Sequence, residues 1–556
     1  MHELMENRDT LYDNMSSGRM EVITRSAVAC ILAIGLLGLP AACVTKPDPD
    51  AGPGLVLLLA IDQLRRGRVH ADLPGGLGRL VREGRFFVDA SLAHADTTTC
   101  PGHATMLTGR HPGPAGIPSN AFIDRESLRV VYCVDDPGED ASVFGSELGR
   151  SPHKLRVTAL GDWMKAARPE TRVFALSGKD RAAVTLGGQR PDAAYWFDWD
   201  RGHFTTSHYY LDELPRWIRD WRPSPIPSKW EHAGGDPPNG ARRDDYPAED
   251  PEYSRTSPHP VQDLPELYAS PFADQMTLEF ALALVTREHL GRGDGPDLLA
   301  VSLSATDTIG HLYGPNSQEA RDAILRLDRA LGSFLDQLEQ RVGRGRVLGV
   351  LTSDHGVLPL PEWWQEQGKG SCPLAGGRAS LSALSTGLSE RLADRFGPPP
   401  PNQQWVVHFY NQFRLNRRLA EARGVDPDAI LEVARAHLAN QPGVAAVWRA
   451  SEIAADGGDE PFATLYRNSH DPERSADLLV QPVSGCLFSP YEHGTSHGSP
   501  YPYDRDVPLI FFGTGVEPGR IPGPAATVDI APTLAAALAI TGPSELDGRA
   551  LPLVER

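Results

Sequence analysis

The sequence predicts an α/β protein with a mostly parallel central sheet, helices on both faces and cap insertions. Two observations suggest this fold. Short apolar segments, each followed by polar residues, are typical of strands buried on both faces of a sheet, and a long amphipathic segment at about 317–341 is typical of a helix packed against one. The apolar segments are residues 54–63, 172–181, 297–307, 346–356 and 507–513.

The polar residues at the ends of these segments are expected to lie along one edge of the sheet. Asp62 lies near the end of the first segment, Lys179 near the end of the second, Asp307 at the end of the third and Asp354 near the end of the fourth. In open parallel sheets, ligands bind beyond the carboxyl ends of the strands. The sequence therefore predicts a site at that edge.

After the leader, residues 54–556 are predicted to form one catalytic domain. Its long amphipathic helix, for which Asn316 followed by Glu319 indicates an N-cap, is expected to serve packing. Two stretches, about 190–265 and 362–490, interrupt the strand-helix alternation. We interpret them as cap insertions that either stabilise the core or shape access to the site.

The first 43 residues are predicted to be a signal or lipoprotein leader. The apolar run 27–42 is short for a membrane span but suits a secretory signal. "LPAAC" resembles a lipoprotein cleavage box, so lipidation of Cys43 and ordinary cleavage after Ala42 both remain open. Residues 44–53 have linker composition. We expect an exported protein, periplasmic or at the cell surface, with membrane attachment if Cys43 is lipidated.

Charge and cysteine content limit the partners and the compartment. The net charge of -18 argues against a nucleic-acid partner, because no basic stripe is available to neutralise phosphates. Four cysteines follow the leader, an even number that an oxidising compartment would pair, and they allow three pairings. They are Cys100, Cys133, Cys372 and Cys486. Their spacing excludes a CxxC zinc knuckle. Separately, we expect the chain to be monomeric.

Aspartate and histidine residues recur in the motifs that follow the apolar segments. They are Asp62, Asp307, His311, Asp354, His355, His493 and His497. This mixture suits zinc or a similar divalent ion. Asp307 and His311 are four residues apart, so one helical turn would direct both towards one ion. Seven ligands exceed one tetrahedral site, whereas two ions about 4 Å apart would use them.

The stretch "DTTTCPGHATMLTG", residues 96–109, places three threonines before a predicted helix start. A protonated threonine hydroxyl is a poor nucleophile, but a divalent ion can hold it as an alkoxide. The N-terminus of the helix would supply amide donors to an anionic substrate. For Thr97 and Thr98 we expect N-capping instead, and for His103 a structural hydrogen-bonding role.

Five motifs together resemble the alkaline phosphatase superfamily across nearly all of the mature chain: "AIDQ", "TTCPGH", "TDTIGH", "TSDHG" and "TSHGSPYPYD". The resemblance implies that Thr99 is a nucleophile that becomes phosphorylated. It also implies two Zn²⁺ ions per chain, one held by Asp62, Asp354, His355 and Thr99, the other by Asp307, His311 and His497. "SHGSPY" favours His497 over His493, and no acidic cluster convincingly completes a magnesium site.

Threonine nucleophiles occur in two branches of this superfamily, one acting on diesters and the other on monoesters. The phosphate-irrepressible alkaline phosphatases carry a Lys-x-Arg that "SGKDR" resembles, which implies roles for Lys179 and Arg181. A phosphate monoester has about one negative charge more than a diester, so paired cations favour it. "GIPSN" similarly nominates Asn120, although Pro118 and Ser119 depart from the family pattern.

We therefore expect a hydrolase of small phosphate monoesters that acts through a phosphothreonine intermediate. The main alternative is a phosphodiesterase or nucleotide pyrophosphatase of the same superfamily. A phosphoryl-type transferase would need an acceptor pocket, and a surface protein with structural zinc would show no turnover. His and Asp ligands also leave manganese open as the metal.

Overall fold

The computed structural model describes residues 52–232, 242, 244–454 and 460–555. The predicted leader and most of the linker fall outside these residues. No helix in the described part of the chain has the length and hydropathy that crossing a membrane requires.

A nine-stranded sheet forms the centre of the fold, in the order β19-β2-β18-β11-β1-β10-β5-β6-β7. Its strands are β1 (Leu55–Ile61), β2 (Arg85–Ser91), β5 (Val173–Ser177), β6 (Ala193–Asp198), β7 (His203–Thr205), β10 (Asp297–Leu303), β11 (Val347–Thr352), β18 (Ile510–Gly513) and β19 (Gly519–Ala526). The five strands from β11 to β6 run parallel. This confirms the predicted fold class, but β6 and β7 lie within residues 190–265, so the start of that stretch belongs to the central sheet and not to an insertion.

The apolar segment at 507–513 forms β18, which runs antiparallel to both of its neighbours. The direction follows from where the chain enters the strand. Just before β18, the short helix α18 (Pro502–Arg505) lies against the segment that leaves β11, and Gly356 N donates to Asp504 O at 2.7 Å. The chain therefore enters β18 from the carboxyl end of β11 and must run back along it.

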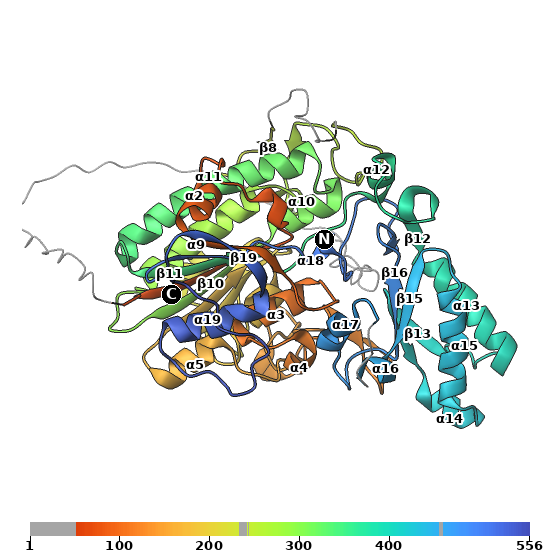
Figure 1. The fold of residues 1–556 in the computed structure, drawn as a ribbon. Coiled ribbons are helices and arrows are strands. Elements are labelled where there is room, and N and C mark those ends of the chain that lie inside the picture. Colours follow the sequence, from red (N-terminus) through yellow and green to blue (C-terminus); the bar gives the residue numbers. More distant parts are fainter. Residues whose placement is uncertain (1–51, 233–241, 243, 455–459, 556) are drawn as a thin grey trace, which may run out of the picture. The chain divides into compact units, whose positions relative to one another are not determined.

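Helices lie on both faces of the sheet (Figure 1), and each face packs into its own apolar core. Side chains of β1 alternate between them: Leu57 and Leu59 face one core, whereas Val56 and Leu58 face the other. The first core is completed by α2 (Gly76–Glu83), α9 (Phe272–Arg287) and α11 (Gln318–Val342), and the second by α3 (Thr99–Thr108), α5 (Leu160–Ala167), α6 (Asp180–Gly187) and α19 (Ile530–Ala537).

The predicted amphipathic helix is α11, but its cap differs from the expectation. Ser317 is the N-cap residue, and its hydroxyl accepts a hydrogen bond from Ala320 N at 3.0 Å. Asn316 lies one residue too early for this role. The prediction was wrong because Asn and Ser are both good caps, and the sequence offers them side by side.

Residues 362–490 contain a second sheet with its own apolar core. Its strands are β13 (Val406–Phe409), β14 (Gln412–Leu415), β15 (Val444–Arg449) and β16 (Leu478–Pro482), and α13 (Leu381–Phe396), α14 (Arg417–Arg423) and α15 (Pro427–Ala439) cover it. Gln412 Nε2 donates to Ser119 Oγ and to Ala121 O, both at 3.1 Å. This second sheet therefore contacts the loop that contains Asn120.

Two disulfides pair the four cysteines that follow the leader. Cys100 is joined to Cys133, and Cys372 to Cys486. The first bridge connects the start of α3 to the segment after β4 (Val130–Tyr132), and the second spans residues 372–486 in the second insertion. The structure thus selects one of the three pairings that the sequence left open.

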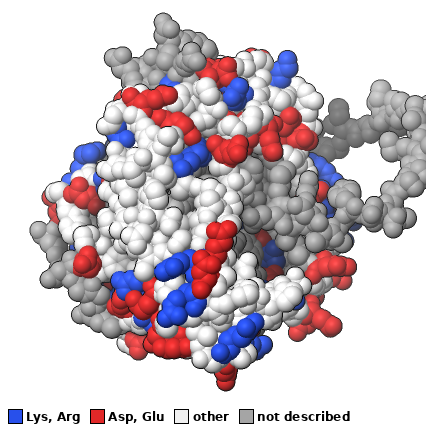
Figure 2. Space-filling model, turned by 90° about the vertical axis from the view of Figure 1, so that its right-hand side faces the viewer, with Lys and Arg blue, Asp and Glu red and all other residues white. Residues whose placement is uncertain are grey.

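The face of the molecule in Figure 2 carries acidic and basic side chains interspersed with uncharged ones. Its Lys and Arg residues form no continuous stripe among the side chains described there.

Candidate active site

The predicted metal ligands lie together at the carboxyl end of the parallel strands. Asp62 follows β1, Asp354 and His355 follow β11, and Asp307 and His311 lie on α10 (Ala305–Tyr313), which follows β10. The loop before α18 adds His497. The structure divides the six residues into two groups with ligand atoms within 4.8 Å of one another: Asp62, Asp354 and His355; and Asp307, His311 and His497.

The spacing of the ligand atoms suits a metal ion in each group. In the first, His355 Nε2 lies 3.4 Å from Asp62 Oδ1 and 3.2 Å from Asp354 Oδ2. In the second, Asp307 Oδ1 lies 3.2 Å from His311 Nε2 and 3.7 Å from His497 Nε2. Around a tetrahedral ion with bonds of about 2.0–2.1 Å, neighbouring ligand atoms are about 3.3 Å apart.

The surrounding backbone fixes which nitrogen of each histidine faces the carboxylates. Nδ1 lies 2.7 Å from Thr495 O in His311, 2.9 Å from Gly356 O in His355 and 2.7 Å from Thr97 O in His497. A carbonyl oxygen can only accept, so each Nδ1 donates, and in the neutral imidazole Nε2 then keeps a lone pair for a metal.

Several ligand atoms of the first group are buried without a hydrogen-bond partner: Asp62 Oδ1, Asp354 Oδ2 and His355 Nε2. Buried polar atoms are almost always paired, so such a cluster calls for a cation. The donor types and their spacing fit a divalent ion in each group, and the unpaired atoms support this for the first group.

The carboxylates of the two groups affect one another electrostatically. Burial, together with the nearby Asp307 and Asp354 carboxylates, raises the pKa of Asp62 to about 7. Burial likewise raises the pKa of Asp354 to about 6. Burial also acts on Asp307, but His311 and Lys179 outweigh it and hold its pKa well below the usual value. This negative charge would favour bound cations.

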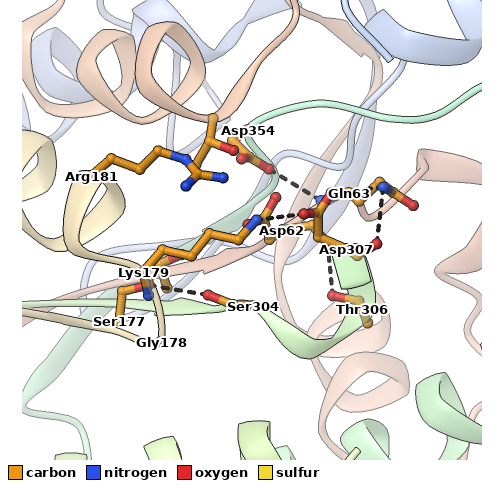
Figure 3. A network of polar contacts seen from close by, with 12 residues as sticks. Asp62, Gln63, Ser177, Gly178, Lys179, Arg181, Ser304, Thr306, Asp307 and Asp354 are labelled. Carbon is orange, nitrogen blue, oxygen red and sulfur yellow. Dashed lines mark hydrogen bonds and ion pairs between the residues drawn. The ribbon is translucent and has the colours of Figure 1, made fainter. Parts of the chain in front are cut away.

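Lys179 reaches this carboxylate cluster from the loop after β5 (Figure 3). Its ammonium lies 2.5 Å from Asp62 Oδ2 and 2.5 Å from Asp307 Oδ2, so it contacts both ligand groups. Burial opposes the charged form, but the two carboxylates outweigh it and raise the Lys179 pKa well above its usual value. The loop is held by Lys179 N, which donates to Ser177 Oγ, and by Gly178 O, which accepts from Trp199 Nε1.

Arg181 is also buried, and its side chain extends from the first turn of α6 towards the carboxylate cluster (Figure 3). Its Nη1 donates to the Tyr132 hydroxyl at 3.4 Å, and that hydroxyl donates to Asp180 Oδ1 at 2.7 Å. Arg150 Nε also donates to Asp180, at 2.5 Å. Tyr132 and Arg150 therefore support the turn that carries Arg181, although sequence analysis did not identify either.

The three consecutive threonines have different roles. Thr99, the expected nucleophile, is 1% exposed and begins α3. Thr98 is at the N-cap position, but its hydroxyl donates to Asp96 Oδ1 at 2.6 Å and makes no capping bond. Thr97 Oγ1 accepts from Gly498 N and donates to Ser499 O. The capping prediction was wrong for both, because Asp96 and the loop of His497 take their hydroxyls.

Asn120 lies next to Thr99 through the backbone of Cys100. Its Oδ1 accepts from Cys100 N at 2.7 Å, and its backbone oxygen accepts from Cys133 N at 2.9 Å. The Cys100–Cys133 disulfide joins the same two residues. The bridge thus holds the Asn120 side chain beside the start of α3.

Helix α3 packs closely against the loop that carries Asp354. A Cβ on Gly102 would lie 2.3 Å from Asp354 O, so any larger residue would force the two apart. His103 on the next position is fully buried; its Nδ1 lies 2.9 Å from Thr99 O and its Nε2 2.8 Å from Ser302 Oγ. These contacts are those of a structural hydrogen-bonding residue.

Gln63 is a further site residue, which sequence analysis did not identify. Its Nε2 donates to Asp307 Oδ1 at 2.7 Å, and its backbone N donates to Asp354 Oδ1 at 3.1 Å, so it bridges the two ligand groups. Its φ of 66° is unusual for glutamine. The signal in the sequence was its position directly after Asp62. His493 belongs to neither group.

Comparisons with known proteins agree with this arrangement. The family described as "Type I phosphodiesterase / nucleotide pyrophosphatase" matches residues 56–369. Alkaline phosphatase PhoV of Synechococcus elongatus is 30% identical over 531 residues, which cover 91% of this chain and 93% of PhoV. Alkaline phosphatase PafA of Elizabethkingia meningoseptica is 30% identical over 541 residues, covering 93% and 96%.

Solved structures of PafA have the same fold. The wild-type structure superposes with a TM-score of 0.80 at 27% identity and covers 90% of this chain and 98% of PafA. A second PafA structure carries substitutions at a threonine, an asparagine, a lysine and an arginine, in that order, and has a TM-score of 0.79 at 26% identity. The chain therefore belongs to the type I phosphodiesterase and nucleotide pyrophosphatase family of the alkaline phosphatase superfamily, and it is an enzyme of the phosphate-irrepressible alkaline phosphatase type.

Proposed function

We propose that the protein is an exported phosphatase that hydrolyses small phosphate monoesters through a phosphothreonine intermediate at a two-zinc site. The observation that carries the proposal is the position of the Lys179 ammonium, 2.5 Å from one carboxylate of each ligand group. A buried cation there can contact non-bridging phosphoryl oxygens of a substrate bound at the same centre. A diester has one such charged oxygen fewer.

The two ligand groups would hold the metal ions. Asp62, Asp354 and His355 would bind one zinc ion together with the Thr99 hydroxyl, and Asp307, His311 and His497 would bind the other. When bound, the ions supply positive charge that favours the ionised nucleophile and the leaving oxygen. Zinc binds the neutral imidazole through its free nitrogen, and here each Nε2 is directed at the carboxylates that would share the ion.

Thr99 Oγ1 would lose its proton to solvent and attack phosphorus, forming the phosphothreonine ester as the bond to the leaving alcohol oxygen breaks and that oxygen takes a proton from solvent. Water would then displace Thr99 from phosphorus and release inorganic phosphate. Throughout, the side chains of Asn120, Lys179 and Arg181 would hold the non-bridging phosphoryl oxygens, so that the attacking and leaving oxygens stay in line. Such positioning provides much of the catalysis in phosphoryl transfer.

The PafA variant supports the choice of these four residues. Its substituted residues have the same types and order as Thr99, Asn120, Lys179 and Arg181 here. Threonine and asparagine are 21 residues apart in both chains, and lysine and arginine are two apart.

The test compares an aryl phosphate monoester with its matched methyl diester. Zinc-loaded wild type should prefer the monoester by orders of magnitude in kcat/KM. The Lys179→Ala/Arg181→Ala variant loses two charge-assisted contacts worth about 1.5–3 kcal/mol each, so its monoester kcat/KM should fall roughly 10²- to 10⁴-fold. Diester hydrolysis should fall much less. Lys165→Ala/Arg168→Ala, at the end of α5, is the matched control and should behave as wild type.

The family description favours one rival, phosphodiester hydrolysis. That function predicts a wild type that prefers the diester and a double variant that barely differs from it. Either result would show that Lys179 and Arg181 do not select monoesters.

Export is supported by the two disulfides, which form and persist in oxidising compartments. Residues 1–43 would direct export, and lipidation of Cys43 would attach the protein to a membrane. Cell fractionation combined with mass spectrometry of the mature N-terminus distinguishes a lipidated Cys43 from a free, cleaved chain. Retention of the protein in the cytoplasm would contradict export.

A further inference from the structure

A third cluster of histidine and carboxylate side chains lies outside the active site. His232 follows β8 (Lys229–Trp230), His259 begins β9 (His259–Pro260), and Glu319 lies in the first turn of α11. The two short strands pair with each other in the first insertion and lie beside α11 (Figure 1). The ligand-type atoms of these three residues all lie within 4.8 Å of one another.

The spacing within this cluster is similar to that of the active-site groups. Glu319 Oε1 lies 3.4 Å from His232 Nε2 and 3.4 Å from His259 Nε2. These distances are long for N–H···O hydrogen bonds, which prefer 2.7–3.2 Å. They match the separation of about 3.3 Å between neighbouring ligands of a tetrahedral zinc ion.

The cluster is closed to solvent and lacks other partners. The side chains of His232, His259 and Glu319 are 2%, 4% and 1% exposed. Both histidine Nε2 atoms and both Glu319 oxygens are buried without a hydrogen-bond partner. Buried polar atoms are almost always paired because leaving them unpaired is costly, so an arrangement of four needs a further group to satisfy it.

Two neighbouring groups complete the arrangement. His259 Nδ1 lies 2.8 Å from Ser254 O, which can only accept, so the lone pair of Nε2 faces Glu319. Asp244 Oδ1 lies 3.7 Å from His232 Nε2 and is also buried without a partner. Asp244 lies outside the group of three and its side chain is 30% exposed, but this oxygen is the candidate for the fourth donor that a tetrahedral site needs.

We propose that His232, His259, Glu319 and Asp244 bind a structural zinc ion, separate from the ions of the active site. Two imidazoles and two carboxylates suit zinc, and a fully ligated, buried ion leaves no open position for catalysis. The ion would join the first insertion to α11. Helix α10, which carries Asp307 and His311, ends one short turn before α11, so the insertion would be anchored beside the active-site ligands.

The test measures zinc per chain by inductively coupled plasma mass spectrometry after zinc saturation and gel filtration. Glu319→Gln and His259→Ala should each contain one zinc fewer per chain than wild type. Asp322→Asn is the matched control: Asp322 lies one turn further along α11 and accepts from Trp230 Nε1 at 2.7 Å, so it joins the same elements without a ligand role. It should keep the wild-type zinc content.

If a variant fails to fold, a measurement on the wild type tests the same proposal. Crystals of wild type should show anomalous scattering at the zinc edge between His232, His259 and Glu319. Equal zinc content in Glu319→Gln and wild type, or absence of that anomalous peak, would show that the two imidazoles and Glu319 form an ion-paired cluster without metal. Neither readout depends on phosphatase activity, so failure here leaves the proposed function untouched.

Discussion

Replacement of Gln63 by methionine tests whether one side chain couples the two metal groups. Methionine keeps the length of the side chain but removes the Nε2 donor to Asp307, while the backbone bond to Asp354 remains. A hydrogen bond to a charged group contributes about 1.5–3 kcal/mol, which corresponds to roughly 10- to 150-fold in affinity. Loss of partners that orient metal ligands typically costs about 10- to 100-fold, in the same range.

The expected result is therefore a zinc affinity that falls roughly 10- to 100-fold, with phosphatase activity lost at limiting zinc and largely recovered at excess zinc. Competition with a chromophoric chelator measures the affinity, and kcat/KM is measured at both zinc concentrations. Gln481→Met is the control, because Gln481 is equally buried but bonds to Trp448 and Tyr501. If Gln63→Met binds zinc within twofold of wild type, Gln63 does not orient Asp307.

Three further predictions concern protons, packing and the disulfide. Asp62 and Asp354 have pKa values raised to about 7 and 6 in the metal-free protein, so protons compete with zinc as the pH falls below about 7; calorimetry in buffers of different ionisation enthalpy should show proton release on zinc binding and weaker binding at pH 6 than at pH 8. Gly102→Ala should destabilise by about 1–3 kcal/mol in urea unfolding because its Cβ would overlap the Asp354 backbone, although alanine favours helices; unchanged stability would refute that contact. Cys133→Ala should lower monoester kcat/KM at saturating zinc by releasing Asn120, and an unchanged value would mean that the bridge serves stability alone.

Much of the active site could be predicted because its ligands are tied to local features. Strand ends place Asp62 and Asp354 at one edge of a parallel sheet, and the spacing of Asp307 and His311 requires only one helical turn. The resemblance to a known superfamily then assigned His497, which no local spacing could have placed.

Other contacts depend on packing between distant segments, which no local pattern reveals. Tyr132 and Arg150 support Asp180 from a hairpin and loop about 30–50 residues earlier in the chain. The antiparallel direction of β18 depends on where α18 meets the loop after β11. Similarly, sequence analysis placed Glu319 only at a helix start. The strand pair that brings His259 to Glu319 lies in an insertion that has no recognisable motif.

The ligands of the second metal group span a large part of the chain, from Asp307 on α10 to His497 in the loop before α18. That loop is held to α10 by Thr495 N, which donates to His311 O at 2.8 Å, and to the start of α3 by Thr97. Contacts over such separations cost more loop-closure entropy than local ones and slow folding. During synthesis, Asp307 and His311 would emerge long before His497. The second site would therefore be complete only once the loop that carries His497 has packed against α10. Zinc retention would then distinguish finished molecules from those that stalled.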